Sequence, residues 1–230
     1  MAAPTPRSST PTLSGSATNA TTATATLAPH QVGDYLLVFL AGRGTGTITP
    51  PAGWAAIKSG TTGGVALGLY QQSTLAASNS ETNPQFTFAT SSSFKAHAYS
   101  IPMPNSGAIN RAGVNIASGS SAAADPPSLT SFGGTQDYLW FACMSLSGAS
   151  TITAGPSGYS NFNANAGSSS SDCGIATAWK TALASVTEDP GAFTNGSNQW
   201  LADTLAVWDP VTGGGGGSAH VATNLLFGIG

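Results

Sequence analysis

The chain has 230 residues, which fits one large β domain or two domains of about 100 residues each. Only 7% of its residues are charged, and the formal net charge is −3. Lys and Arg total six and lie far apart along the sequence, so they cannot form the basic patch that phosphate backbones require. We therefore expect no nucleic acid partner.

The low charge predicts a chain that works inside an assembly. A hydrophobic content of 40% argues against disorder, and a nearly neutral surface suits packing against other copies or on a larger body. The longest apolar run, residues 35–41, is far shorter than the roughly 20 residues that span a bilayer. Residues 1–6 lack the apolar core of a signal peptide. We expect a soluble chain with no membrane partner and no Sec export.

Residues 1–22 form a tract rich in Ser, Thr and Pro. Such a tract offers almost nothing to bury, because its side chains are small and polar. The sequence therefore predicts a mobile N-terminal arm.

Residues 23–105 and 125–209 repeat one pattern, with residues 106–124 as a connecting segment. The matched motifs are Asp-Tyr-Leu at 34–36 and 137–139, Thr-Ile-Thr at 47–49 and 151–153, and Pro-x-Gly followed by Trp54 or Tyr159. Their offsets drift from 103 to 105 residues, as short loop insertions between aligned strands would produce. We interpret the chain as two diverged copies of one unit of about 100 residues.

Each copy predicts β-strands, because apolar positions alternate with period two between clusters of Gly, Pro, Asn and Ser. Residues 94–101 and 200–207 show this alternation, which predicts one packed face and one wetter face. We expect an all-β, jelly-roll-like β-sandwich built from the two diverged copies. Two tandem sandwiches are the alternative.

Residues 210–230 combine a linker, the five glycines at 213–217, with an apolar tail. The linker spans on the order of 12 Å root-mean-square. Leu225, Leu226, Phe227 and Ile229 are the candidate partner-binding residues of this tail. The tail docks either on its own sandwich or on a neighbouring subunit by strand addition to a sheet edge.

The sequence predicts no catalytic, cofactor-binding or metal-binding residues. Asp34 and Asp137 occupy the same place in both copies, so we expect each to bind turn amides. Glu188 and Asp189 are the adjacent acidic pair on which an alternative carbohydrate-active enzyme would depend. The three histidines, His30, His97 and His220, have no metal-ligand spacing.

The two cysteines, Cys143 and Cys173, are expected to be free thiols. Cys143 lies in the apolar run 139–144, where a cysteine behaves as a small hydrophobic residue. A disulfide between the two is the alternative.

Aromatic residues at matching positions predict core packing. The matched pairs are Trp54 with Tyr159, Tyr70 with Trp179, and Phe94 with Trp200. Trp208 and the loop aromatics Tyr159, Phe162 and Phe193 are the candidates for a surface platform that stacks on glycans.

The matched motifs resemble an internally duplicated β-sandwich family found among structural proteins of tailed bacteriophage virions. The resemblance covers about residues 20–208 and rests on Gly-Asp-Tyr-Leu-Leu-Val at 33–38, Thr-Ile-Thr-Pro-Pro-Ala-Gly-Trp at 47–54, and Asp-Tyr-Leu-Trp at 137–140. The second copy departs from the pattern, with Tyr159 in place of Trp. The resemblance implies a non-enzymatic virion component, decorating the capsid or associated with the tail, and carries over no catalytic residue.

We therefore expect a virion protein that decorates or cements the capsid through its terminal arms. Its expected partners are the major capsid protein, other virion proteins and further copies of itself, with a trimer suggested by the three-fold positions that decoration proteins occupy. The alternative is a tail or spike module that binds host surface glycans.

Overall fold

The computed structural model describes residues 2–44, 46–105, 110–113 and 116–210, and the regular structure in these ranges is entirely β-strand. The first sheet contains β1 (Thr12–Thr24), β2 (Asp34–Arg43), β3 (Ile48–Thr49), β4 (Trp54–Thr62), β5 (Val65–Gln72) and β6 (Gln85–Pro102). The second sheet contains β7 (Asn110–Gly113), β8 (Ala117–Gly119), β11 (Gln136–Ser147), β13 (Ser160–Asn165), β14 (Cys173–Ser185) and β17 (Trp200–Trp208). The expected all-β class is confirmed.

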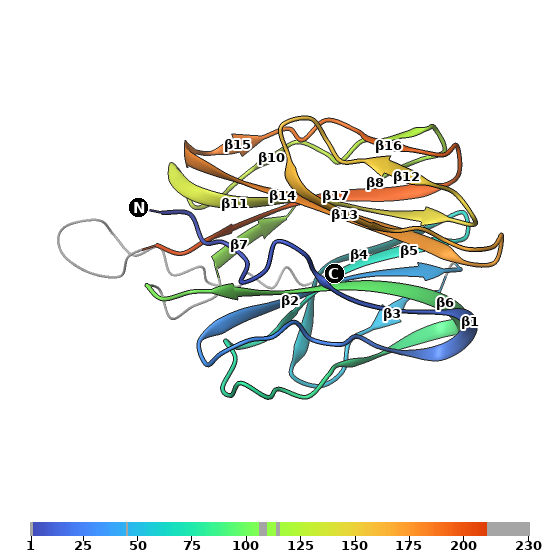
Figure 1. Cartoon of the computed structure of the whole chain (residues 1–230), viewed down its shortest axis with the longest axis horizontal. Coiled ribbons are helices and arrows are strands. Elements are labelled where there is room, and N and C mark those ends of the chain that lie inside the picture. The colour runs from blue at the N-terminus through green and yellow to red at the C-terminus, as the bar shows by residue number, and fades with distance from the viewer. Residues whose placement is uncertain (1, 45, 106–109, 114–115, 211–230) are drawn as a thin grey trace, which may run out of the picture.

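The two antiparallel sheets stack face to face as a β-sandwich (Figure 1). The order across the first sheet is β1-β6-β2-β5-β4, and across the second it is β7-β17-β11-β14-β13. Two small sheets lie on the outer side of the second sheet. One contains β9 (Ala123–Ala124), β12 (Ile152–Ala154) and β16 (Phe193–Asn195), and the other contains β10 (Leu129–Thr130) and β15 (Thr187–Glu188).

The central core lies between the two large sheets. Tyr35, Leu37 and Phe39 of β2 point into it from the first sheet, and Phe141 and Ile175 point into it from the second. The rings of Phe39 and Phe141 meet with centroids 5.3 Å apart. This apolar contact joins the two halves of the chain into one folded body.

Each large sheet also buries its outer face. In the first half, Phe86 near the start of β6 packs on Tyr70 with ring centroids 4.7 Å apart. In the second half, Phe193 and Ile152 of the three-stranded sheet cover Met144 of β11.

Burial on both faces corrects the expectation of one wetter face for residues 94–101 and 200–207. Nearly every residue in these two stretches is buried. The alternation separates two different cores, because Leu205 faces the central core while Ala202 and Ala206 face outer ones. Strands enclosed on both sides read as continuous apolar runs, which explains residues 35–41.

The N-terminal segment differs from the predicted mobile arm. β1 pairs antiparallel with β6 from Thr12 to Thr24, and Arg7 forms an ion pair with Asp34, with its Nε 2.5 Å from Oδ2. The pattern gave no sign of this, because a strand of small polar residues is held by its backbone ladder rather than by apolar side chains.

The predicted connecting segment, residues 106–124, also contributes strands. β7 and β8 pair with β17 at the edge of the second sheet, and β9 pairs with β16. Residues 211–230, with the candidate partner-binding residues Leu225, Leu226, Phe227 and Ile229, lie outside the described residues.

Two of the matched sequence positions lie on opposite faces of their sheets. Tyr35 points into the central core, whereas Tyr138 points into an outer core beside Trp140. Tyr70 likewise faces outward, whereas Trp179 packs against the central core. A shift of one residue along a strand reverses the face of every side chain, so matching the Asp-Tyr-Leu motifs placed these strands out of register by one.

The two cysteines are free thiols, as expected, and both are fully buried. Cys143 points into the central core from β11. Its Sγ lies 3.6 Å from the carbonyl oxygen of Asp203.

Candidate functional site

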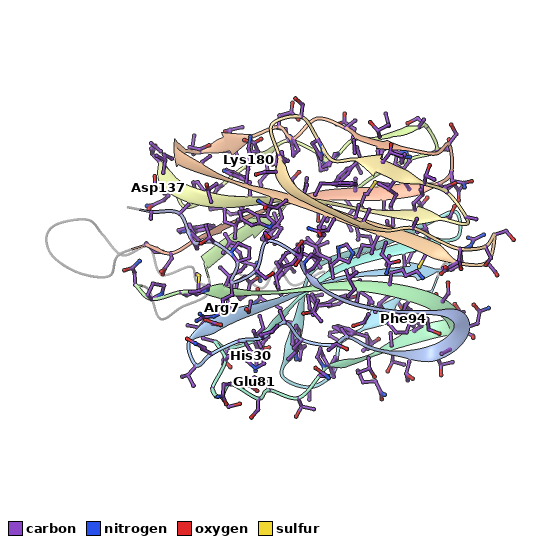
Figure 2. All side chains as sticks on the ribbon, in the orientation of Figure 1. Arg7, His30, Glu81, Phe94, Asp137 and Lys180 are labelled. Atoms are coloured by element: carbon purple, nitrogen blue, oxygen red, sulfur yellow. The ribbon has the colours of Figure 1, made fainter. Side chains whose placement is uncertain are left out.

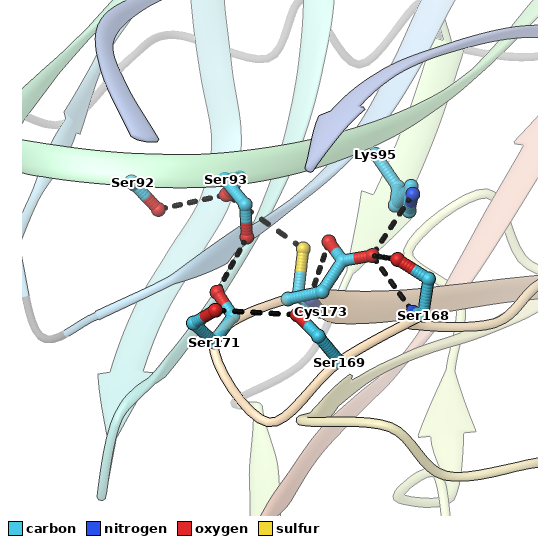
Figure 3. Close-up of polar contacts among 8 residues, drawn as sticks. Ser92, Ser93, Lys95, Ser168, Ser169, Ser171 and Cys173 are labelled. Carbon is cyan, nitrogen blue, oxygen red and sulfur yellow. Dashed lines mark hydrogen bonds and ion pairs between the residues drawn. The ribbon is translucent and has the colours of Figure 1, made fainter. Parts of the chain in front are cut away.

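The interface between the two sheets contains a polar seam formed by β6 and the turn before β14 (Figure 3). Lys95 and Asp172 form an ion pair there, with Nζ and Oδ2 3.2 Å apart. The Ser168 amide and hydroxyl both donate to Asp172, at 2.9 and 3.1 Å. The Ser93 hydroxyl donates to the Ser171 carbonyl at 3.1 Å. These contacts tie one sheet to the other at a defined register.

A second polar group lies further along the same strand. His97 Nδ1 and the Tyr99 hydroxyl each lie 2.8 Å from the hydroxyl oxygen of Thr177 on β14. His97 is fully buried, and burial lowers its pKa to about 3. Its imidazole is therefore neutral at neutral pH.

We count this second group, and the buried Cys173 beside Asp172, as part of the seam. The seam then combines Ser, His, Asp and Cys side chains, yet its chemistry is that of a structural contact. Burial raises the pKa of Cys173 to about 12 and also raises that of Cys143, so both thiols stay protonated. A nucleophile needs a deprotonated or base-activated atom with access to substrate, and the buried side chains of His97, Cys143 and Cys173 offer neither. We infer that the seam fixes the position of the first sheet relative to the second.

His30 and Glu81 hold two loops of the first half together (Figure 2). His30 Nδ1 lies 2.8 Å from the Ala28 carbonyl oxygen, and the Glu81 amide donates to Nε2 at 3.0 Å. The Glu81 carboxylate accepts from the amides of Ala77 and Ser78. Burial acts to raise the pKa of Glu81, but these hydrogen bonds outweigh it and place the pKa below its usual value.

Asp34 accepts a hydrogen bond from a turn amide, as predicted, whereas Asp137 accepts one from a different strand. Asp34 accepts from the Gln31 amide at 2.8 Å, in the turn before its own strand. Asp137 accepts from the amide of Ala184 at 2.9 Å, on the neighbouring strand β14. The Ala184 hydrogen bond is the main reason that the pKa of Asp137 is lowered.

The acidic pair Glu188 and Asp189 does not form a matched pair of free carboxylates. Glu188 Oε1 lies 2.6 Å from Lys180 Nζ, and the ammonium also lies 4.9 Å from the centroid of the Tyr159 ring. Burial is the main cause that raises the pKa of Tyr159, and the Glu188 carboxylate adds to it. These contacts make Glu188 part of a packed ionic cluster.

The proposed aromatic platform is not assembled. Phe193 is 1% exposed and belongs to the outer core, where Phe162 packs beside it with ring centroids 6.5 Å apart. Tyr159 is half-buried under Lys180, and Trp208 packs edge-on against Tyr138 at 5.5 Å. Phe193 is wrong as a platform residue because β16 lies over the second sheet and points this ring inward.

The exposed large hydrophobic side chains are found elsewhere, and three of the five lie close together in the second half of the chain. Five are found in the described ranges, namely Leu13, Val32, Phe132, Leu183 and Val186. Phe132, Leu183 and Val186, which we call the end patch, come from the turn after β10 and from the end of β14 and its connection to β15. Sequence reasoning did not identify them. The available signal was Phe132 itself, an apolar residue inside the turn-forming stretch Ser-Phe-Gly-Gly.

Two pockets lie near the N-terminal segment. A pocket of about 380 Å³ is lined by Arg7, Thr10, Pro29, His30 and Gln31, among others. A second, of about 220 Å³, is formed where residues 2–5 lie beside Pro104, Asn105 and Asp209. The second pocket shows that the N-terminal segment and the end of β17 meet at one end of the molecule.

Within residues 2–210, apart from the gaps given above, no group of three His, Cys, Asp or Glu side chains could hold a metal ion. The same part of the chain contains no helix long and apolar enough to cross a membrane. No protein family, curated protein or solved structure matches this chain. The interaction surfaces must therefore be interpreted from their own chemistry.

Proposed function

We propose that this chain is a non-enzymatic structural protein of a bacteriophage virion that decorates or cements the capsid through its terminal segments. The proposal starts from the sequence resemblance and from a surface with few charges. The seam adds support, because the side chains of His97, Asp172 and Cys173 are buried and each contacts another group of the protein.

The observation that carries the proposal is that both ends of the described chain and the exposed side chain of Phe132 lie at one end of the sandwich. Residues 2–5 lie beside Asp209, so both ends of the described chain leave from the same region. Trp208 packs on Tyr138, at the base of the turn that exposes Phe132. Monomeric proteins rarely leave several large apolar side chains exposed together, so this end is suited to contact with a larger body.

The same proposal includes an internal duplication of the fold. We infer two diverged copies of one jelly-roll-like unit, supported by the equivalent strand orders of the two sheets. In each sheet the first and last strands of that half of the chain lie side by side. On the capsid we expect a homo-oligomer, with a trimer at three-fold positions.

The test is to purify the particles produced by the phage or prophage that encodes this chain. We expect the chain to be present in stoichiometric amounts, and cryo-electron microscopy should place it on the capsid surface. Its absence from purified particles would overturn the proposal. A position at the tip of a tail or spike would replace capsid decoration with the host-binding alternative.

A deletion then tests the terminal attachment. Removing residues 213–230 should abolish or strongly lower incorporation into particles. The matched control is Val32→Ser, which changes an exposed apolar residue of the first half, leaves residues 213–230 intact and should leave incorporation unchanged. Equal occupancy for the deleted chain would remove this segment from the attachment mechanism.

A further inference from the structure

The end patch is exposed to an unusual degree. Phe132 is 86% exposed, Leu183 73% and Val186 38%. The Ser131 amide donates to the Val186 carbonyl at 2.8 Å, so the turn after β10 is held against the chain that follows β14. Three large apolar side chains thus share one end of the second sheet, where exposure to water is unfavourable.

The turn that presents Phe132 is held in a defined conformation by hydrogen bonds. Gly134 has a φ of +69°, which suits glycine, and the Gly133 amide donates to the Ser131 hydroxyl at 3.3 Å. The Tyr138 hydroxyl donates to the Gly134 carbonyl at 2.7 Å. Phe132 is therefore held outward by hydrogen bonds on both sides of the turn.

The described chain ends next to this turn. A Cβ added at Gly133 would lie 2.7 Å from the ring of Trp208, so the last residue of β17 touches the turn directly. Asp209 is fixed in turn, because its carboxylate accepts from the amide and the side chain of Asn105, at 3.0 and 3.1 Å. The described chain, which ends at Pro210, therefore ends beside the turn that presents Phe132.

The composition of residues 211–230 matches the patch. This stretch has no Asp, Glu, Lys or Arg, and it places Leu225, Leu226, Phe227 and Ile229 after the glycines at 213–217. The ten residues between Pro210 and Val221 span on the order of 17 Å root-mean-square if they behave as a Gly-rich linker. That reach is sufficient for a patch that begins beside Trp208.

We propose that residues 221–229 cover the end patch of the same chain, packing their apolar side chains on Phe132, Leu183 and Val186. The same chain is preferred over a second copy, because a short linker gives an effective concentration in the millimolar range. The docking keeps two apolar surfaces out of water in the free protein. The inference concerns the free protein; in the capsid role proposed above, the patch and the tail would separate and contact the capsid instead.

The test is hydroxyl-radical footprinting of the full chain by mass spectrometry, with the double variant Leu226→Ser, Phe227→Ser as the comparison. In the variant, the modification rates of Phe132 and Leu183 should rise several-fold. Leu13 and Val32, which are exposed on the first half, should keep their rates and serve as internal controls. The conservative variant Asn224→Ser should leave the Phe132 rate unchanged.

Equal modification of Phe132 in the full chain and in the double variant would overturn the proposal. The measurement is repeated over a wide range of protein concentration. If Phe132 stays protected on dilution, the result supports docking within one chain. If its protection fades on dilution, a second copy covers the patch and the proposal is overturned. Because the isolated protein is used, failure here is distinct from failure of the capsid role, which is measured on particles.

Discussion

Lys95 on β6 and Asp172, in the turn before β14, form an ion pair that joins the two sheets, with Nζ and Oδ2 3.2 Å apart. Asp172 is fully buried. Burial acts to raise its pKa, but hydrogen bonds from Ser168, Cys173 and Lys95 outweigh this effect and hold the pKa below its usual value. The carboxylate is thus charged and fully compensated at neutral pH.

The variant Lys95→Met should lower the free energy of unfolding by about 3 kcal/mol, because it leaves a buried carboxylate without its counter-ion. Urea unfolding followed by tryptophan fluorescence measures this loss. The double variant Lys95→Met, Asp172→Asn should recover part of it, since the amide carries no charge. A single variant as stable as the parent protein would show that the ion pair does not hold the sheets together.

Stability should fall as the pH drops below about 6.5 because of His97. Burial lowers the pKa of His97 to about 3, so the folded state binds the proton less readily than the unfolded state. The stabilisation is complete above the unfolded pKa and is lost between there and the folded pKa, at about 1.4 kcal/mol per pH unit. Urea midpoints measured from neutral pH to about pH 4 test this dependence.

The control for this dependence is His97→Gln, which keeps a side chain able to bond Thr177 and removes the titrating ring. Its stability should vary less over the same pH range. An identical pH profile in the two proteins would assign the dependence to other groups.

Gly68 on β5 leaves room for Tyr70 two residues along the strand. A Cβ at Gly68 would overlap the Tyr70 ring, which is held by a hydrogen bond of 3.1 Å to the Ile48 carbonyl and by contact with Phe86. Gly68→Ala should therefore cost about 2 kcal/mol of stability. The matched control is Gly113→Ala, where the added Cβ meets only ordinary contacts and should be tolerated. Equal effects of the two substitutions on thermal unfolding would contradict this account.

A substitution at Phe193 tests whether this residue belongs to the core or to a glycan-binding platform. Because its ring is buried in an outer core, Phe193→Ala should lower the free energy of unfolding by about 3 to 5 kcal/mol. Val32→Ala, at an exposed position, should change it by less than about 0.5 kcal/mol. Unfolding in denaturant compares them. Unchanged stability of the Phe193 variant would restore this residue as a surface candidate.

Part of the candidate site could be anticipated from sequence. The acceptor role of Asp34 follows from an acidic residue placed directly before an apolar strand, and the free state of Cys143 follows from its apolar surroundings. Phe132 could be noticed as an apolar residue within a predicted turn. Its neighbours Leu183 and Val186 could not, because their exposure depends on how β14 ends against the turn after β10.

The sequence by itself determined the all-β class, since alternation with period two between turn residues is a local property of each strand. Only the tertiary structure decided which face each side chain uses. Tyr35 and Tyr138 share a motif yet enter different cores, because a shift of one residue reverses the faces of a strand and the motif does not fix the register. The same holds for β1, whose small polar residues gain their place from backbone pairing with β6 across the sheet.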